Sequence, residues 1–324
     1  MIDPVDRFRG CVVGAAVADA MATTLESSET ARAALDSRFA TVDADDEDAA
    51  AVRDFLPSPA LGLSPGQWGA PTQIFRLTAE FLLREGRADA DRYARALLAV
   101  PAAARRAWGA STRKACQALA DGVLPMRSGR DAEPTSEPLS RGVALGLFDA
   151  ARGSADLYYQ ARALTRLTHH DSRCVSGVFV VARAVSDLVA ALLIDRDALI
   201  RMVVEAARFS EEKALPEDDP LSGRLAAVQP GASMLELVAR HGNSDLVLEA
   251  IPFAVGVFLA HSESYEEAVV QAAKAGGGAA ANTFLVGALS GALHGFRAIP
   301  TRLRMHVEDL DGLLTLADQL SGGD

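Results

Sequence analysis

The chain has 324 residues, of which 49% are hydrophobic and only 6% aromatic, and its formal net charge is −11. This acidic balance argues against a nucleic-acid-binding protein, which would present a basic face. The hydrophobic fraction is sufficient for one large core, and the low aromatic content favours closely packed helices over sheets.

The three cysteines, Cys11, Cys116 and Cys174, are far apart and form no CxxC pair. Neither a zinc site nor a disulfide framework is therefore predicted, and a reduced cytoplasmic setting is expected. The first ten residues lack the apolar core of a signal peptide. The uncharged run at 275–296 is long enough to cross a membrane, but its glycines and polar side chains favour a buried core helix. We therefore expect no membrane association.

The first predicted element is a helix over residues 6–25 that is rich in small side chains. An acidic connection follows at 27–62, and its run of acids lacks the glycine and terminal glutamate of a calcium-binding EF-hand loop. An apolar stripe then predicts a helix beginning near Pro71, because proline is tolerated in the first helical turn. A further helix is predicted over 105–119.

In the second half, Asp171 is placed to cap a helix that runs towards residue 194. The acidic, proline-bearing stretch at 210–231 predicts a loop. The run at 276–295 predicts a glycine turn followed by a buried helix, with glycines four residues apart that let another backbone approach closely. An amphipathic helix is predicted at 309–320. No repeat or linker divides the chain, so a single domain spanning 1–324 is expected.

Two stretches resemble the metal-binding motifs of the ADP-ribosylglycohydrolase family. The stretch GQWGAPT at 66–72 is similar to the family pattern Gly-x-Trp-Thr-Asp-Asp-Thr. The stretch GGGAAA at 276–281 is similar to Gly-Gly-Asp-x-Asp-Thr, which precedes a helix of the type Gly-Ala-Leu-x-Gly-Ala. The opening helix and the Thr-His-x-Asp pattern at 168–171 also fit the family. The resemblance covers nearly the whole chain and implies an all-α, multi-helix domain.

In the family these motifs hold two magnesium ions through four aspartates and two threonines. The matching positions here carry Gly69, Ala70, Pro71, Gly278, Ala280 and Ala281. Magnesium requires oxygen ligands, which none of these side chains supplies. We therefore expect no magnesium, no other metal and no cofactor.

The resemblance also suggests which residues remain at the site. Candidates for acid–base catalysis are Glu26, Asp19, His169 and Asp171. Candidates for ligand contact are Trp68, Thr72, Arg141, Thr168, Gly276, Gly277, Gly278 and Asn282. A capping or buried hydrogen-bonding role is favoured for Asp19. The adjacent side chains of His169 and His170 point apart and lack a third ligand, which argues against a metal site. The family's Gly-Asn-Gly segment is replaced by 135–137, which weakens the expectation of ADP-ribose binding.

Three functions are compatible with these residues. The leading hypothesis is a pseudoenzyme whose reshaped pocket binds an ADP-ribose-like or other nucleotide ligand, or a protein partner. The first alternative is a metal-independent hydrolase of an ADP-ribosyl or other N- or O-glycosidic bond, which needs only a well-placed acid and base or nucleophile. The second is a structural or interaction protein. The metal-independent hydrolase would be favoured if at least two of the candidate carboxyl groups met in one open pocket. It would be disfavoured if the backbone at Gly278 and Pro71 filled the cleft.

Overall fold

The computed structural model describes residues 2–26, 54–130, 132–153, 156–190, 195–214 and 218–323. Every regular element in these ranges is a helix, and the only β-type pairing within them is two isolated bridges, Ser58–Leu63 and Thr135–Leu246. The predicted all-α fold is confirmed.

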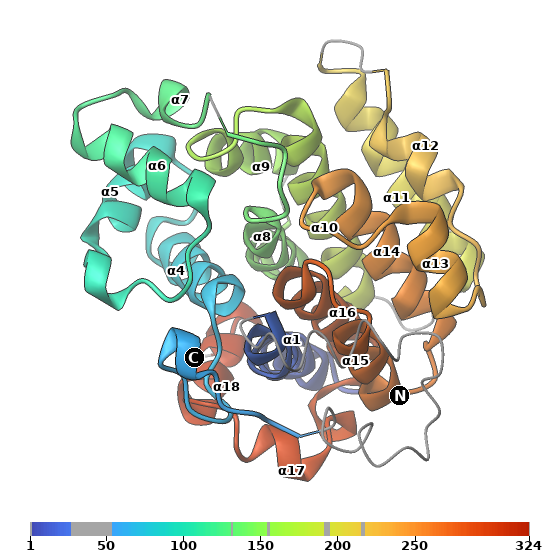
Figure 1. The fold of residues 1–324 in the computed structure, drawn as a ribbon. Helices are drawn as coiled ribbons and strands as arrows, with labels where there is room; N and C mark the ends of the chain where they lie inside the picture. Colours follow the sequence, from blue (N-terminus) through green and yellow to red (C-terminus); the bar gives the residue numbers. More distant parts are fainter. Residues whose placement is uncertain are drawn as a thin grey trace.

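The chain order of the helices is given with the labels of Figure 1. They are α1 (Pro4–Glu26), η2 (Pro59–Leu61), α4 (Ala70–Glu85), α5 (Ala90–Ala99), η3 (Ala102–Ala104), α6 (Ala110–Ala120), α7 (Pro125–Ser128), α8 (Leu139–Arg152), α9 (Leu157–Arg166), α10 (Ser172–Ala190), α11 (Arg196–Glu211), α12 (Leu221–Ala226), α13 (Met234–His241), α14 (Val247–Ala260), α15 (Tyr265–Lys274), α16 (Ala279–His294), η4 (Phe296–Ala298), α17 (Thr301–Arg304) and α18 (Leu310–Leu320).

Helices α1 and α16 lie side by side at the centre of the molecule, although they are near opposite ends of the chain (Figure 1). A Cβ atom added to Gly10 would lie 2.2 Å from the carbonyl oxygen of Gly291, and one added to Gly291 would lie 2.0 Å from that of Gly10. The close backbone approach predicted from the glycine spacing is confirmed, because only glycine leaves room for this contact.

The predicted buried helix is also confirmed, since almost all of α16 is buried. Among the described helices, α1 is long and apolar enough to cross a membrane over Pro4–Leu25, but 94% of its most apolar window lies inside the protein. A core helix meets the same criterion of length and composition, and the burial of α1 matches that role.

The remaining helices surround the central pair in two groups. Helix α8 packs against α10 and α4, and α5 to α7 lie beyond α4 on one side of the molecule (Figure 1). The second group contains α10, α11, α12 and α14. Helix α10 packs against α11, α11 packs against α12, and α14 packs against α16 of the central pair. One apolar core therefore runs through both groups and meets the N-terminal ends of α4 and α16.

Two predicted elements are wrong in their extent. The helix expected over 105–119 begins only at Ala110, because Ala107 has a positive φ of 49° and Gly109 follows it as the N-cap. The expected loop at 210–231 contains the short helix α12. The predicted starts near Pro71 and Asp309 are confirmed, and Asp171 accepts a hydrogen bond of 2.8 Å from the Arg173 amide in the first turn of α10.

Candidate functional site

A cavity of about 620 Å³ opens between the N-terminal ends of α4, α6, α8 and α16. Both stretches that resemble metal-binding motifs line it, the first through Ala70 and Pro71 and the second through Gly277, Gly278, Ala280 and Ala281. Gly278 and Pro71 form part of the wall of this open cavity and do not plug it. Its volume is typical of sites for drug-sized ligands.

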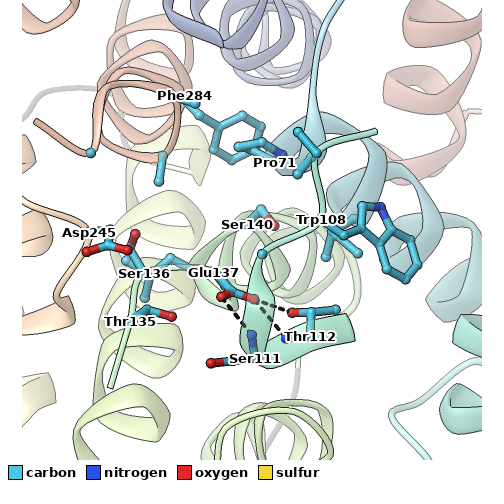
Figure 2. Close-up of a pocket in the computed structure, with 18 of the residues that line it drawn as sticks. Pro71, Trp108, Ser111, Thr112, Thr135, Ser136, Glu137, Ser140, Asp245 and Phe284 are labelled. Carbon is cyan, nitrogen blue, oxygen red and sulfur yellow. Dashed lines mark hydrogen bonds between the residues drawn. The ribbon is translucent and has the colours of Figure 1, made fainter. Parts of the chain in front are cut away.

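The cavity has an apolar side made by α4, α16 and their neighbours. Pro71 and Phe284 face each other across this part of the site (Figure 2). The apolar residues that line the cavity as a whole are Leu61, Ala70, Pro71, Ile74, Ala107, Trp108, Ala110, Leu139, Ala280, Ala281, Phe284 and Leu285. Residues of both stretches that resemble metal-binding motifs lie among these apolar lining residues.

The opposite side is polar and acidic. The polar side chains that line the cavity are Thr23, Ser111, Thr112, Glu133, Thr135, Ser136, Glu137, Ser140, Ser244 and Asp245, and no Lys, Arg or His is among the described residues that line it. Glu137 lies near the middle of this side (Figure 2). Its carboxylate accepts hydrogen bonds from the Ser111 amide (3.3 Å), the Thr112 amide (2.9 Å) and the Thr112 hydroxyl (2.6 Å).

These hydrogen bonds make Glu137 the cap of α6. The first N–H groups of a helix have no partner within the helix, and a carboxylate is favoured there by the helix dipole. Gly109 permits the approach, since a Cβ atom at this position would lie 2.0 Å from the Glu137 carboxyl carbon. The carboxylate is thus fixed in position, and its side chain is 20% exposed.

His169 lies directly behind this carboxylate and is fully buried. Its Nε2 atom is 3.0 Å from the Thr135 hydroxyl and 4.0 Å from a Glu137 carboxylate oxygen, while Nδ1 is 2.9 Å from the Thr168 hydroxyl. Burial, with the nearby Arg141 guanidinium, lowers the pKa of His169 to about 3. The imidazole is therefore neutral at pH 7 and does not form an ion pair with Glu137.

Arg141 and Thr168 continue the same buried network beneath the cavity. The Arg141 Nη1 group donates to the Thr168 hydroxyl (2.7 Å) and to the Leu164 carbonyl (2.9 Å). The guanidinium also lies 5.5 Å from the centre of the Tyr93 ring, within the range of a cation–π contact. Both residues are fully buried, and neither is on the cavity wall.

Asp19 joins α1 to the first motif. Its buried carboxylate accepts hydrogen bonds from the amides of Gly69 (3.2 Å) and Thr72 (2.9 Å) and from the Thr23 hydroxyl. It thereby satisfies the free N–H groups at the start of α4. Burial raises the pKa of Asp19 above its ordinary value. Asp19 and the buried Thr72 lie behind the cavity wall.

Three further candidate site residues do not line the cavity or have side chains outside the described part of the structure. The Trp68 indole N–H donates to the Glu308 carbonyl (3.2 Å), and Arg106 covers the ring at 4.5 Å. Asp171 forms an ion pair with Arg173 at 2.7 Å. Glu26 is the last residue of α1, and its side chain lies outside the described part of the structure.

The glycine bend before α16 is clamped by Asn243. The Gly278 amide and the Asn282 side-chain amide both donate to the Asn243 carbonyl, at 2.8 and 2.7 Å. The Asn243 side chain in turn donates to the Ala275 carbonyl at 2.7 Å. Gly276 and Gly277 have φ values of 69° and 65°, which glycine adopts readily.

The donor set does not fit a dinuclear magnesium centre. None of the six motif side chains bears an oxygen, and the described residues contain no group of three or more His, Cys, Asp or Glu side chains that could hold a metal ion. The space is also restricted, because a Cβ atom at Gly278 would lie 2.9 Å from the backbone of Ser244 and Asp245. An aspartate at this position would need that backbone to move.

Among the candidate residues with described side chains, the cavity wall includes Gly277 and Gly278 but neither Asp19 nor Asp171. The wall instead carries Glu133, Glu137 and Asp245, which were not singled out as acid–base candidates. Glu137 lies in the segment that replaces the family's Gly-Asn-Gly pattern, and Asp245 reaches the site because the isolated bridge Thr135–Leu246 joins two distant loops. No local motif in the sequence predicts that pairing.

Comparison with known proteins identifies relatives over the full length. The profile of the ADP-ribosylglycohydrolase family matches residues 1–324. An uncharacterized protein of Archaeoglobus fulgidus is 28% identical over 329 residues, covering 97% of this chain and 96% of its own length. A solved structure described as an ADP-ribosylglycohydrolase-related protein complex superposes with a TM-score of 0.75 at 23% identity and covers 99% of each chain. At this identity the structural match shows a shared fold.

Proposed function

Because the chain belongs to the ADP-ribosylglycohydrolase family, we propose that it is a degenerate member that lacks the dinuclear magnesium centre and uses the remaining cavity to bind a ligand. One observation carries this proposal. The two stretches that should hold the metals meet at one open cavity, and there they present glycine, alanine and proline. An apolar surface of this kind can bind a ligand but cannot coordinate magnesium.

The contacts around both motifs support a site that is stable without metal. Asp19 holds the start of α4 by two backbone hydrogen bonds, and Asn243 holds the start of α16. Asp19 thereby pairs N–H groups that the start of α4 would otherwise leave free, and the Asn243 carbonyl fixes the bend at the N-cap of α16. The cavity can therefore keep its shape with no ion to cross-link the two helices.

Magnesium is expected to leave the stability of the protein unchanged. A ligand at 100 times its dissociation constant would stabilise a folded protein by about 2.7 kcal/mol, so tight sites would be evident as a rise in the melting temperature. Thermal unfolding should be measured with EDTA, with millimolar MgCl2 and with NaCl at matched ionic strength, together with a calorimetric magnesium titration. Two tight sites in the titration would contradict the proposal.

A metal-independent hydrolase is the second candidate, favoured by Glu133, Glu137 and Asp245 on one cavity wall. Cleavage of a glycosidic bond needs an acid and a second carboxylate that acts as base or nucleophile. We expect no release of ADP-ribose from ADP-ribosyl-arginine or ADP-ribosyl-serine. Release that survives EDTA, and that falls by about 100-fold or more in Glu137→Gln but not in the exposed Glu263→Gln control, would establish the enzyme instead.

A further inference from the structure

The division of the cavity into an apolar and an acidic side restricts the chemistry of its ligand. Pro71 and Phe284 lie on one side, and Glu137 with Asp245 on the other (Figure 2). A ligand that fills the space must place an apolar part against the first side. It must place a hydrogen-bond donor against the second, because an ionised carboxylate can accept hydrogen bonds but cannot donate them.

The cavity offers little to a phosphate group. Phosphates in proteins are held by Lys or Arg, by a metal ion or by the free N–H groups of a helix terminus. No basic side chain is among the described lining residues, and the donor set does not fit magnesium. Protein groups also occupy part of three of these helix termini: Glu137 accepts from amides of α6, Asp19 accepts from the Thr72 amide of α4, and the Asn243 carbonyl accepts from the N-cap amide of α16.

Ser140 adds a polar group that the protein itself does not use. It lines the cavity, is 3% exposed, and its hydroxyl has no hydrogen-bond partner among the residues that the structure describes. Buried hydroxyls are normally paired, since an unpaired one retains the cost of its desolvation. This hydroxyl is therefore a group on the cavity lining that a ligand could pair with.

We propose that the ligand is a compact amphipathic amine and not a phosphate-bearing nucleotide, an inference that rests on the proposed role of the cavity as a binding site. The ammonium group donates to the Glu137 carboxylate, which is pre-positioned by its bonds to α6. Asp245 and Glu133 add negative charge to the lining of the same cavity. The apolar body of the amine packs against Pro71, Phe284 and Leu285, so its burial adds to the charge interaction.

A matched series of probes tests the charge preference. Binding of 2-phenylethylamine, 2-phenylethanol, 3-phenylpropanoate and ADP-ribose to the full chain should be measured by calorimetry or ligand-observed NMR at low salt. We expect the amine to bind at least about tenfold more tightly than the alcohol, because a hydrogen bond to a charged group is worth more than a neutral one. The propanoate and ADP-ribose should bind more weakly than either.

Variants then locate the binding. Glu137→Gln should remove the preference for the amine, whereas the exposed Glu263→Gln should retain it. Ala281→Trp fills the apolar side without a change of charge and should abolish binding of every probe, so it gives an answer even if Glu137→Gln fails to fold. Amine binding that neither cavity variant weakens would overturn the inference.

The binding results distinguish failure of the amine inference from failure of the proposed ligand-binding role of the cavity. Tighter binding of ADP-ribose than of the amine, lost in Ala281→Trp, would overturn the amine and leave the cavity as a magnesium-free binding site. Binding of none of the four probes to the wild-type chain would overturn the amine inference and would also count against a ligand-binding cavity.

Discussion

Gly291→Ala is expected to destabilise the protein by about 3 kcal/mol or more, at the upper end of the cost of overpacking a core. The new methyl group would lie 2.0 Å from the Gly10 carbonyl oxygen, and the obstacle is the backbone of α1. No side-chain rotation can relieve this contact, so α1 and α16 must separate. Urea unfolding followed by circular dichroism measures the loss.

Gly223→Ala is the matched control for this change. Gly223 also lies in a helix, α12, but an added Cβ atom would meet its nearest neighbour at 3.7 Å, an ordinary contact distance. Alanine is preferred over glycine in helices, so this variant should be as stable as the wild type or more so. Equal stabilities of Gly291→Ala and Gly223→Ala would refute the tight packing of the central pair.

Lowering the pH from 7 to 5 is expected to cost about 2 kcal/mol of stability through His169 alone, given its pKa of about 3 in the folded protein and about 6.5 in the unfolded chain. As the pH falls through the unfolded pKa, the unfolded chain binds a proton that the folded protein does not. Stability therefore falls with pH over this window and continues to fall towards pH 3. Unfolding at a series of pH values measures the slope.

The variant His169→Gln should have a shallower slope than the wild type between pH 7 and 5, because it removes the titrating group. Thr135→Val provides the control, since it removes one hydrogen bond of the imidazole and leaves the imidazole in place. This control should be less stable at every pH but should keep the wild-type slope. A wild-type slope in His169→Gln would show that the imidazole is not held neutral by burial.

The fold was predictable wherever a pattern was local or repeated. The glycine spacing in α16 predicted a close helix contact, and Gly10 of α1 supplies it. The order of proline and threonine at 71–72 predicted the start of α4. The start of α6 was not predictable from its own residues, because its capping carboxylate, Glu137, lies more than twenty residues further along the chain.

The candidate site was predictable only in part for a similar reason. The sequence shows that Gly278 stands where the family pattern has a metal-binding aspartate. It does not show that the backbone of Ser244 and Asp245, from a different segment, lies against this glycine. Trp68 and Asp19 matched the family pattern, yet their contacts place them behind the wall, where they hold loops and helix termini. Contacts between segments that are distant in sequence decide which residues of the family pattern face the cavity. The periodicity within a single segment does not predict these contacts.

The pairing of α1 with α16 has a consequence for synthesis of the chain on the ribosome. The Tyr265 hydroxyl at the start of α15, the helix that precedes α16, donates a hydrogen bond to the Gly14 carbonyl of α1 across 251 residues. At about 5 to 20 residues per second, an apolar α1 would emerge on the order of 10 to 50 s before its partner. Nascent chains that stop short of α16 would expose that apolar surface, so a chaperone that shields α1 should raise the yield of native protein.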